Sequence, residues 1–434
     1  MKYTFLIYFA LFCTVANPVP AAGQNNNGNF AEKSVLISGR WFKIAVIEEG
    51  IYKITWSALK EAGLKFPGNP RLYGNNYGQL SFYNSDPSPD DLKEISIMTV
   101  TGSDGIFNEG DYLLFYAQGT SGWRYDQSAG KYIYKRHYYS DTAFYFITSA
   151  PSPGKQINSV TTETDQPGYS SYSYDALHRH EKDAENLIKS GREWFQPVSS
   201  LNGIAIKPGF SDIILSEGIS FRFRVLGRSS VPSMFRLYEG ETLHSGVLVP
   251  EVDMFSTTGT YAREETVSGT IIPSSSSPSF EIRFYNNGQQ GAKGWLDYAE
   301  LQGRASTVFT GKMLLFSDAK SAAPGRITEF NVKSSSATMT VWEITDPFNP
   351  QIIPYIKSGD YCTFRLKTDS LRKFIAFTSD QAKTPLTRMK PVANQNLHGS
   401  DPADMIIVTH PLFYNYARKL ADFHYNNSGL ISLI

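Results

Sequence analysis

The chain has 434 residues, and its 41 basic residues (Lys and Arg) equal its 41 acidic residues (Asp and Glu), so its formal net charge at pH 7 is zero. At roughly 150 residues per domain, this length predicts two to four domains. A balanced charge provides no overall field that would attract nucleic acid or an anionic membrane surface, so a nucleic-acid-binding role is disfavoured.

The chain begins with the features of a secretory signal peptide. Lys2 precedes an apolar run from Phe5 to Ala16, and small residues follow up to Gly23, which predicts a signal peptide over residues 1–23. A membrane-spanning anchor needs about 20 consecutive apolar residues, and neither this run nor a later one supplies them. We therefore expect an exported protein in the periplasm or at the outer cell surface, without a transmembrane anchor.

The cysteine content excludes an intramolecular disulfide after export. Cys13 lies inside the signal peptide, and the bulky Leu11 and Phe12 before it do not fit a lipoprotein signal. Cys362 is then the single cysteine of the mature chain, although export places it in an oxidising compartment. Stability must therefore come from apolar cores.

An all-β domain is predicted after a short spacer. Residues 24–34 form an Asn-rich spacer with little to bury. Residues 35–165 contain short β-rich runs separated by Gly, Asn, Asp and Pro, with one brief helix at 56–62. The segment GDYLLFYAQG, residues 110–119, has a continuous apolar run that is typical of a strand buried on both faces.

A helical connection is predicted over residues 166–202. Apolar residues of the segment SYDALHRHEKDAENLIKSGREWF, residues 173–195, fall at helical spacing. The segment carries His178 and His180, but residues two apart on a helix point about 200° apart around its axis. The two imidazoles could not chelate one metal ion from a regular helix, so we expect a structural role for both.

Two β-sandwiches are predicted next. In residues 203–305, the segments SFRFRVLG and SFEIRFYN alternate apolar and polar residues, as in a jelly-roll-like sandwich of two sheets. Residues 306–395 contain four β-rich runs separated by turns, a spacing typical of an immunoglobulin-like sandwich. Cys362 alternates there with Phe364 and Leu366, which predicts a buried and inert thiol.

The pattern changes in the last segment, residues 396–434. Met405 to Val408 predict a strand, Pro411 stands where the first helical turn tolerates proline, a helical stripe follows, and LISLI predicts a second strand. This β-α-β order is the first unit of a parallel sheet, which needs both faces covered. Alone, the unit buries too little apolar area to offset its conformational entropy, so we expect residues 400–434 to be mobile or loosely docked.

Two further groups of residues have features of functional sites. His410 follows the first strand of the β-α-β unit, where open α/β sheets bind ligands, but without a nearby nucleophile a helix-entry role with Pro411 is favoured. The segment SDGIFNEGD, residues 103–111, is rich in oxygen ligands and could be a calcium loop, although the EF-hand order is absent and a β-turn needs the same residues. Its candidate ligands are Asp104, Asn108, Glu109 and Asp111. We assign no catalytic residue, cofactor or metal ligand, because no local pattern supplies one.

Several phrases, taken in order, resemble the N-terminal part of the type IX secretion system sortases, which are gingipain-like cysteine peptidases. The phrases are GIYKIT (50–55), GDYLLFYAQG (110–119), YSDTAFYFIT (139–148), SGREWF (190–195), GWLDYAEL (294–301), NQNLHG (394–399) and VTHPLFYNYARKLADFH (408–424). The resemblance implies a mainly β chain. It implies successive β-sandwich-like accessory domains, followed by the first β-α-β unit of an incomplete caspase-like α/β peptidase domain at 396–434.

The resemblance also implies a function. Such sortases lie at the outer surface of Bacteroidota cells, remove the C-terminal sorting domain from secreted cargo and help to attach cargo to lipopolysaccharide. Their nucleophilic cysteine and their histidine lie downstream of the opening β-α unit, so neither Cys362 nor His410 inherits these roles. LISLI also departs from the family's Val- and Lys-rich second strand, so we expect a chain truncated at the start of the peptidase domain. Expected partners are other type IX secretion components, outer-membrane proteins and, through the peptidase domain, sorting-domain cargo.

Two other hypotheses come from different classes of protein. Exposed aromatic residues such as those in YKRHYYSD, residues 134–141, are compatible with a stand-alone surface module that binds glycans or an outer-membrane partner. A calcium-dependent adhesin depends only on the loop at 103–111. Whether the chain has enzyme activity of its own is therefore left open by the sequence.

Overall fold

The computed structural model describes residues 31–434 except 75–77, 84, 87 and 337. The predicted signal peptide and most of the Asn-rich spacer lie outside the described residues. The described residues form two compact units: residues 38–394 belong to the larger one, and residues 31–37 and 395–434 belong to the smaller one. Across the described residues, no helix combines the length and the apolar character that crossing a membrane would require.

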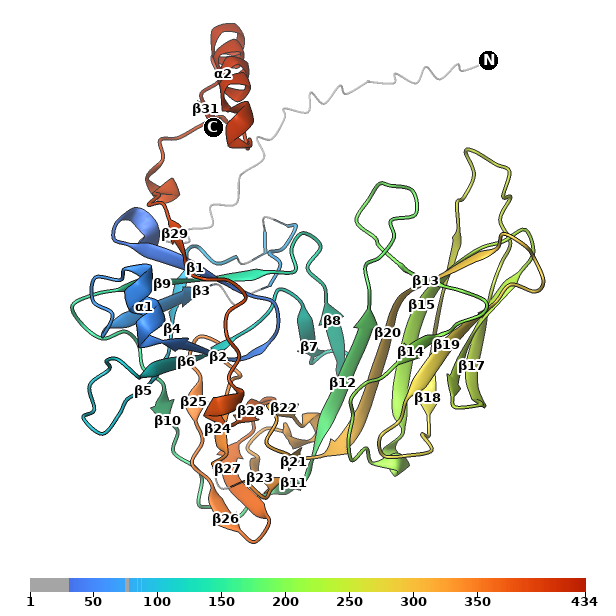
Figure 1. Ribbon diagram of the computed structural model, residues 1–434, viewed down its shortest axis with the longest axis horizontal. Helices are drawn as coiled ribbons and strands as arrows, with labels where there is room; N and C mark the ends of the chain where they lie inside the picture. The colour runs from blue at the N-terminus through green and yellow to red at the C-terminus, as the bar shows by residue number, and fades with distance from the viewer. Residues whose placement is uncertain (1–30, 75–77, 84, 87, 337) are drawn as a thin grey trace, which may run out of the picture. The chain divides into compact units, whose positions relative to one another are not determined.

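The first β domain of the larger unit has two sheets around one apolar core (Figure 1). Its strands are β1 (Trp41–Val46), β2 (Gly50–Thr55), β3 (Pro70–Gly74), β4 (Lys93–Ile95), β5 (Met98–Val100), β6 (Tyr112–Ala117), β9 (Ala143–Ser149) and β29 (Lys390–Val392). They form the sheets β29-β1-β9-β3-β4 and β2-β6-β5. The predicted helix is confirmed as α1 (Trp56–Ala62), which the Thr55 side chain caps by accepting a hydrogen bond from the N–H of Ala58.

Strand β6 is buried on both faces, as its apolar run predicted. Leu113 and Phe115 face the core of the first domain. Leu114 and Tyr116 face the opposite way, into a second core that includes Trp342 of the third domain. The sheet β2-β6-β5 is therefore covered on both sides, which explains why polar residues do not alternate with apolar ones in this strand.

The second domain is a two-sheet sandwich. Its strands are β12 (Ser173–Glu181), β13 (Gln196–Val198), β14 (Ile204–Ile206), β15 (Ile219–Arg228), β16 (Ser233–Glu239), β17 (Thr242–Val249), β18 (Arg263–Ile271), β19 (Phe280–Tyr285) and β20 (Lys293–Ser306), with a 3-10 turn η2 (Leu215–Glu217). One sheet has the order β12-β20-β15-β18 with β13 also paired to β20, and the other has the order β14-β19-β16-β17. Phe221 and Phe223 on β15 and Ile282 and Phe284 on β19 are buried between the sheets, which confirms the alternation predicted for both strands.

The predicted helical connection over 166–202 is wrong. Residues 173–181 form strand β12, which pairs antiparallel with β20 along its whole length, from the Ser173–Ser306 pair to the Glu181–Tyr298 pair. The long ladder satisfies the backbone of β12 and outweighs a weak helical periodicity that has no tertiary partner of its own. β12 and β13 therefore belong to the second domain, which begins well before residue 203.

The third domain is also a two-sheet sandwich. Its strands are β10 (Asn158–Ser159), β11 (Tyr169–Ser171), β21 (Val308–Phe309), β22 (Leu314–Ser317), β23 (Ile327–Ser334), β24 (Thr340–Glu343), β25 (Gln351–Ile352), β26 (Ile356–Ser358), β27 (Tyr361–Lys367) and β28 (Lys373–Phe377), with 3-10 turns η3 (Ala319–Ser321) and η4 (Ser379–Gln381). The sheets are β10-β25-β24-β28-β22 and β11-β23-β27-β26, with β21 paired to β23.

The borders of the third domain differ from the predicted 306–395. β10 and β11 join its sheets from upstream, through parallel pairs with β25 and β23. At the other end, β29 belongs to the first domain, because it pairs with β1. Pairing partners so far apart in the chain leave no local signal, so turn spacing alone cannot place these borders.

A separate β-hairpin completes the larger unit. It consists of β7 (Gly122–Asp126) and β8 (Lys131–Lys135), which pair only with each other among the described strands. Trp123 packs edge to face on Tyr134, and Tyr125 packs likewise on Tyr132, with ring centroids 5.4 and 5.0 Å apart. These cross-strand aromatic pairs stabilise a hairpin that no wider sheet supports.

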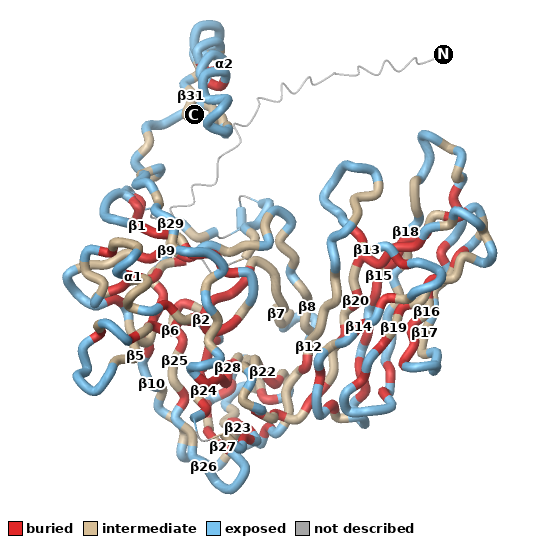
Figure 2. The backbone as a smooth tube through the Cα atoms, viewed as in Figure 1, coloured by how far each residue is buried: buried red, intermediate tan, exposed pale blue. Residues whose placement is uncertain are grey.

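The smaller unit contains the predicted β-α-β element. Its elements are η1 (Val35–Ile37), η5 (Leu397–Gly399), β30 (Met405–Ile406), η6 (Pro411–Phe413), α2 (Tyr414–Ser428) and β31 (Ser432–Leu433). β30 and β31 are parallel, as predicted. Only Ala417 and Ala421 of α2 are buried, so most of this helix is exposed (Figure 2).

Candidate functional site

Cys362 lies on β27 and is fully buried, as predicted. Its neighbours in the core include Phe364 and Leu366. Burial raises the pKa of its thiol, and the smaller opposing effect of Lys357 does not reverse this. A buried thiol with a raised pKa has little thiolate to offer as a nucleophile.

His178 and His180 lie on β12 rather than on a helix, so both side chains point to the same face of the sheet. His178 packs edge-on against Phe210, and burial, with a smaller contribution from His180, lowers the pKa of His178 to about 4. The Nε2 of His180 is 2.8 Å from Oε1 of Gln196. No cluster of three His, Cys, Asp or Glu side chains that could hold a metal occurs in the described part of the chain.

The loop at 103–111 uses its carboxylates to fix its own backbone. Asp111 accepts hydrogen bonds from the N–H groups of Gly102 and Asn108, at 3.0 and 2.8 Å. Asp104 accepts from the N–H of Ile106 and from the side-chain amide of Asn108, at 3.0 and 2.8 Å. These bonds favour the β-turn interpretation, because each oxygen of the two carboxylates already has a donor.

His410 caps the short helical turn η6. Its Nδ1 accepts a hydrogen bond from the N–H of Leu412 at 3.2 Å, directly before Pro411. The predicted helix-entry role is confirmed.

Two clefts that the sequence did not predict lie in the larger unit, and the β7–β8 hairpin lines both. The central cleft has a volume of about 1110 Å³ and is lined by β12 residues 174–177, by residues 312–317 around β22, and by Glu49, Arg124 and Lys373. The outer cleft has a volume of about 940 Å³ and is lined by residues of β8, β12, β15 and β20 and by residues near Phe82. Both linings mix apolar and aromatic side chains with polar and charged ones in similar proportion.

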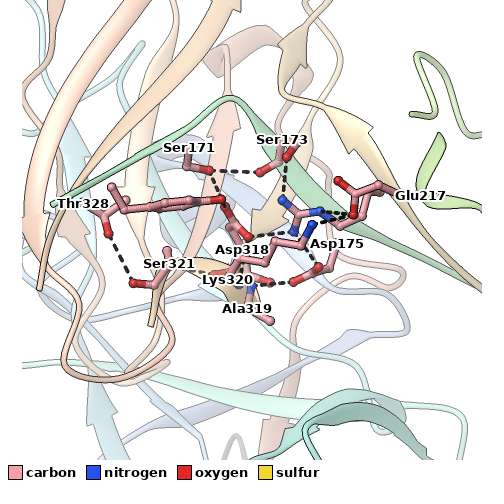
Figure 3. A network of polar contacts seen from close by, with 12 residues as sticks. Ser171, Ser173, Asp175, Glu217, Asp318, Ala319, Lys320, Ser321 and Thr328 are labelled. Carbon is pink, nitrogen blue, oxygen red and sulfur yellow. Dashed lines mark hydrogen bonds and ion pairs between the residues drawn. The ribbon is translucent and has the colours of Figure 1, made fainter. Parts of the chain in front are cut away.

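A buried ion network fixes one end of the central cleft (Figure 3). Nη1 of Arg304 on β20 lies 2.7 Å from both Asp175 of β12 and Asp318 of the third domain. Burial alone would lower the pKa of Arg304, but hydrogen bonds and charge interactions with Asp318 and Asp175 together outweigh burial, so the net shift of this pKa is upward. The Arg304 guanidinium therefore stays charged and joins the second domain to the third. The ion network of Arg304, Asp175 and Asp318 is called the joint below.

Further contacts of Asp175 and Asp318 tighten this joint. The N–H of Ala319 donates to Asp175 at 2.7 Å, and the hydroxyl of Ser171 donates to Asp318 at 2.7 Å (Figure 3). Both carboxylates are thus satisfied by donors, whereas Nε of Arg304 has no hydrogen-bond partner among the described residues and lies 3.9 Å from Glu217. Satisfied partners are the condition for a stable buried ion network, and the two carboxylates meet it.

Tyr132 of the hairpin connects the two strands that line the central cleft. Its hydroxyl donates to Asp175 on β12 at 3.0 Å and lies 2.7 Å from the hydroxyl of Ser317 on β22. Burial and the neighbouring Asp175 raise the pKa of Tyr132, so the phenol keeps its proton and remains a donor. The hairpin is thereby held against both walls.

A second charged group lies at the first-domain side of the central cleft. Nζ of Lys373 is 2.5 Å from Oε1 of Glu49, and the hydroxyl of Tyr116 also donates to Glu49. Burial alone would raise the pKa of Glu49, but Lys373 and Tyr116 outweigh it and the net shift is downward. Lys373 therefore neutralises the Glu49 carboxylate, and both donors contact its Oε1 atom.

The outer cleft is lined by arginine side chains stacked on aromatic rings. The guanidinium of Arg179 lies 4.0 Å from the ring centroid of Tyr298 and 4.6 Å from that of Tyr134. The same guanidinium is paired with Glu181 and Glu300. These contacts create a rigid wall of flat polar and aromatic surfaces.

The fold and the clefts define a class: a multidomain β-sandwich protein that also carries a β-α-β unit. No family model matches the chain, and no curated protein matches it. Among solved structures, the crystal structure of dimeric latent PorU from Porphyromonas gingivalis matches with a TM-score of 0.76 and 21% identity over 94% of this chain. The fold is thus PorU-like, and the chain spans 38% of the length of that PorU chain.

Another match carries no argument about fold. The insecticidal delta-endotoxin Cry8Ea1 from Bacillus thuringiensis has a TM-score of 0.19 and 15% identity, covering 37% of this chain and 27% of the toxin chain. The fold expected from the sequence, mainly β with successive sandwich-like domains, agrees with the PorU match.

Proposed function

We propose that this chain is the non-catalytic N-terminal region of a type IX secretion sortase related to PorU. The observation that carries the proposal is the PorU-like fold over 94% of the chain. The order of the phrases that resemble this sortase family supports the same assignment. In this proposal the protein is exported to the periplasm or the outer cell surface, and its full-length parent removes C-terminal sorting domains from cargo.

The proposal assigns no peptidase activity to residues 31–434. Thiolate attack on a peptide carbonyl needs an accessible cysteine with a lowered pKa and a nearby base. Cys362 is fully buried with a raised pKa, and His410 caps a helical turn in the other unit. In the proposed parent, the thiolate and its base come from the peptidase domain.

Deletion of the gene that contains these codons in the source organism tests the proposed role. We expect secreted cargo to retain its C-terminal sorting domain, which mass spectrometry of the cargo C-termini would detect. Re-expression of the intact gene should restore processing. If cargo from the deletion strain is processed as in the wild type, the chain is not part of the sortase.

An assay of the purified chain tests the absence of catalysis. A peptide that spans a sorting-domain junction should remain intact on incubation with the chain, and treatment with iodoacetamide should change nothing. Cleavage that disappears in Cys362→Ser would assign catalysis to this chain and contradict the proposal.

The outer cleft favours a second candidate function, a surface module that binds glycans. Tyr134 and Tyr138, from the segment 134–141, line this cleft, and Tyr83 stands beside them with 73% of its surface exposed. Aromatic faces next to arginine and carboxylate pairs suit sugar rings, which present both C–H faces and hydroxyls.

Binding of purified lipopolysaccharide from the source organism distinguishes this candidate. Tyr83→Ala should weaken binding about tenfold, the loss of roughly one aromatic contact. Tyr416→Ala, at an equally exposed tyrosine of α2, is the matched control. Equal binding by the two variants, or no binding by the wild type, would remove the glycan hypothesis.

A further inference from the structure

Two strand edges border the central cleft. β22 is the last strand of the sheet β10-β25-β24-β28-β22, and β12 is the first strand of the sheet β12-β20-β15-β18. Within the residues described, the main chain of Leu314–Ser317 bonds only to β28, and that of Tyr174–Leu177 bonds only to β20. Each strand therefore has one row of N–H and C=O groups without a partner strand, and both segments line the cleft. The two strands approach each other where Tyr132 contacts Asp175 and Ser317, and Phe316 and Ser317 are buried, so the open part of the β22 edge is Leu314 and Leu315.

The contacts at the hairpin fix where these edges stand. Tyr132 contacts both Asp175 and Ser317, and the N–H of Ala319 donates to Asp175. The buried Arg304 then ties the same aspartate to the third domain. The edges are thus held in place before a ligand arrives, and a preorganised edge loses less entropy when a strand is added to it.

The side chains around β22 complement an extended peptide. Met313, Leu314 and Leu315 are only partly buried, although they are apolar. Trp123 and Tyr125 of the hairpin line the same cleft. The two open residues, Leu314 and Leu315, offer an edge of about 7 Å at about 3.3 Å per residue, enough for a pair of alternate side chains of an added strand to reach these apolar walls.

The charges of the cleft select a partner with a carboxylate. Glu49 is neutralised by Lys373, and Asp175 by Arg304. Lys312 is exposed and has no ion-pair partner in the described ranges. Arg124 donates to the Trp123 carbonyl and to Gln118, and its charge also acts on Glu49, although it forms no direct ion pair among the described residues. Lys312 is therefore the cation that is available to a ligand, with Arg124 beside it.

We infer that the central cleft binds an extended segment of another polypeptide, with apolar residues at alternate positions and at least one carboxylate, as a strand added to the free edge of β22. Main-chain hydrogen bonds to β22 supply affinity, the apolar walls select side chains, and Lys312 with Arg124 selects the acidic residue. The inference goes beyond the proposed function and does not depend on it.

The probe is a phage-displayed library of ten-residue peptides, selected on the full chain. Enriched sequences should alternate apolar residues and contain Asp or Glu, and one synthetic peptide should bind in calorimetry. Hydrogen exchange of residues 314–317 should slow when it binds. The inference would be overturned if no peptide is enriched relative to a surface coated with the Lys312→Glu variant. It would also be overturned if a peptide binds without slowing amide exchange at residues 314–317.

Charge variants test the site. Lys312→Glu should weaken the peptide at least tenfold, because it places a carboxylate against a carboxylate. Lys333→Glu, at an exposed lysine of β23 outside the cleft, is the matched control and should leave affinity unchanged. If Lys312→Glu fails to fold, Thr310→Trp fills the cleft from an exposed position and should also abolish binding. Equal effects of the lysine variants, or unchanged binding by Thr310→Trp, would contradict the site.

Backbone methylation tests strand addition itself. Successive N–H groups of a strand point to opposite edges, so two peptides are compared, one N-methylated at odd positions and the other at even positions. One set should lose at least thirtyfold in affinity and the other should bind nearly normally. If both N-methylated peptides bind equally well, the cleft recognises side chains alone and strand addition is overturned. Binding of anilinonaphthalene sulfonate or of a hexuronic acid oligosaccharide in place of every peptide would assign the cleft to another ligand class.

Discussion

Two segments of this chain that carry large aromatic side chains have opposite surroundings. Strand β6 sends Phe115 into one core and Tyr116 into another, and both side chains are fully buried. Helix α2 buries only two alanines and leaves Phe423 59% exposed (Figure 2). The presence of large aromatic side chains alone is therefore a poor guide to stability, since the neighbouring residues decide how much of their area is removed from water.

Hydrogen exchange should give the largest contrast between these segments. Amides of β6 should exchange only by global unfolding, which costs about 5 kcal/mol or more in a stable domain. Amides of α2 need only local opening, so they should exchange at least about 1,000-fold faster. Equal protection of the two segments in a native-state exchange experiment would break the comparison.

Phenylalanine truncation should sharpen the contrast at one side chain. Phe115→Ala removes a fully buried ring, so we expect a loss of about 3–5 kcal/mol in the free energy of unfolding. Phe423→Ala should change it by less than about 0.5 kcal/mol, because that ring is largely in water already. Urea unfolding followed by tryptophan fluorescence measures both variants, and similar midpoints would refute the difference.

The joint at Arg304 extends the comparison to charged groups. Arg304→Met leaves Asp318, whose side chain is 2% exposed, without its cation, so we expect a loss of about 3 kcal/mol. Arg283→Met is the matched control, because Arg283 pairs with Glu281 at the surface, where water screens the interaction. A thermal melt in which both variants unfold alike would argue against a special role for the joint.

The smallest expected effect comes from His178, on the partly buried strand β12. Burial lowers the pKa of this imidazole to about 4, whereas in the unfolded chain its pKa is near the ordinary 6.5. The unfolded state therefore binds the proton first, and stability falls as the pH drops from about 6.5 to about 4. For a fully buried ring, this difference in pKa would correspond to a loss of about 3 kcal/mol in the free energy of unfolding. Because His178 is partly exposed, we expect a loss of about 1–2 kcal/mol.

Replacing the imidazole isolates its contribution. His178→Gln should flatten the decline in stability between pH 6.5 and pH 4, while His180→Gln should retain most of it, because that variant leaves the His178 ring and its packing on Phe210 in place. Unfolding midpoints across this range provide the measurement. If the unfolding midpoints of the wild type and His178→Gln fall in parallel as the pH is lowered, His178 is not the origin of the decline in stability.

Local patterns predicted the parts of the fold that depend on local chemistry. These parts are the alternation in β15 and β19, the brief helix α1 and the continuous apolar run of β6. In each of them the pattern within the segment itself reflects the contacts that its side chains make. The buried Cys362 follows from the same alternation.

Long-range pairing was not predictable in this way. β12 was expected to be helical because its partner β20 lies more than a hundred residues away, and nothing in residues 173–181 identifies that partner. The clefts are harder still, since Glu49, Asp175 and Lys373 come together only through the packing of three domains. A site assembled from such distant residues has no sequence motif to find.

The pairing of β29 with β1 has a consequence for synthesis. Trp41 stands opposite Val392, so the sheet of the first domain is incomplete until nearly the whole larger unit has been made. At about 5–20 residues per second, ribosomes need roughly 20 to 70 s to cover that interval. During this time β1 keeps an open edge, and a newly made chain has to avoid pairing it with a neighbour's strand before its own arrives.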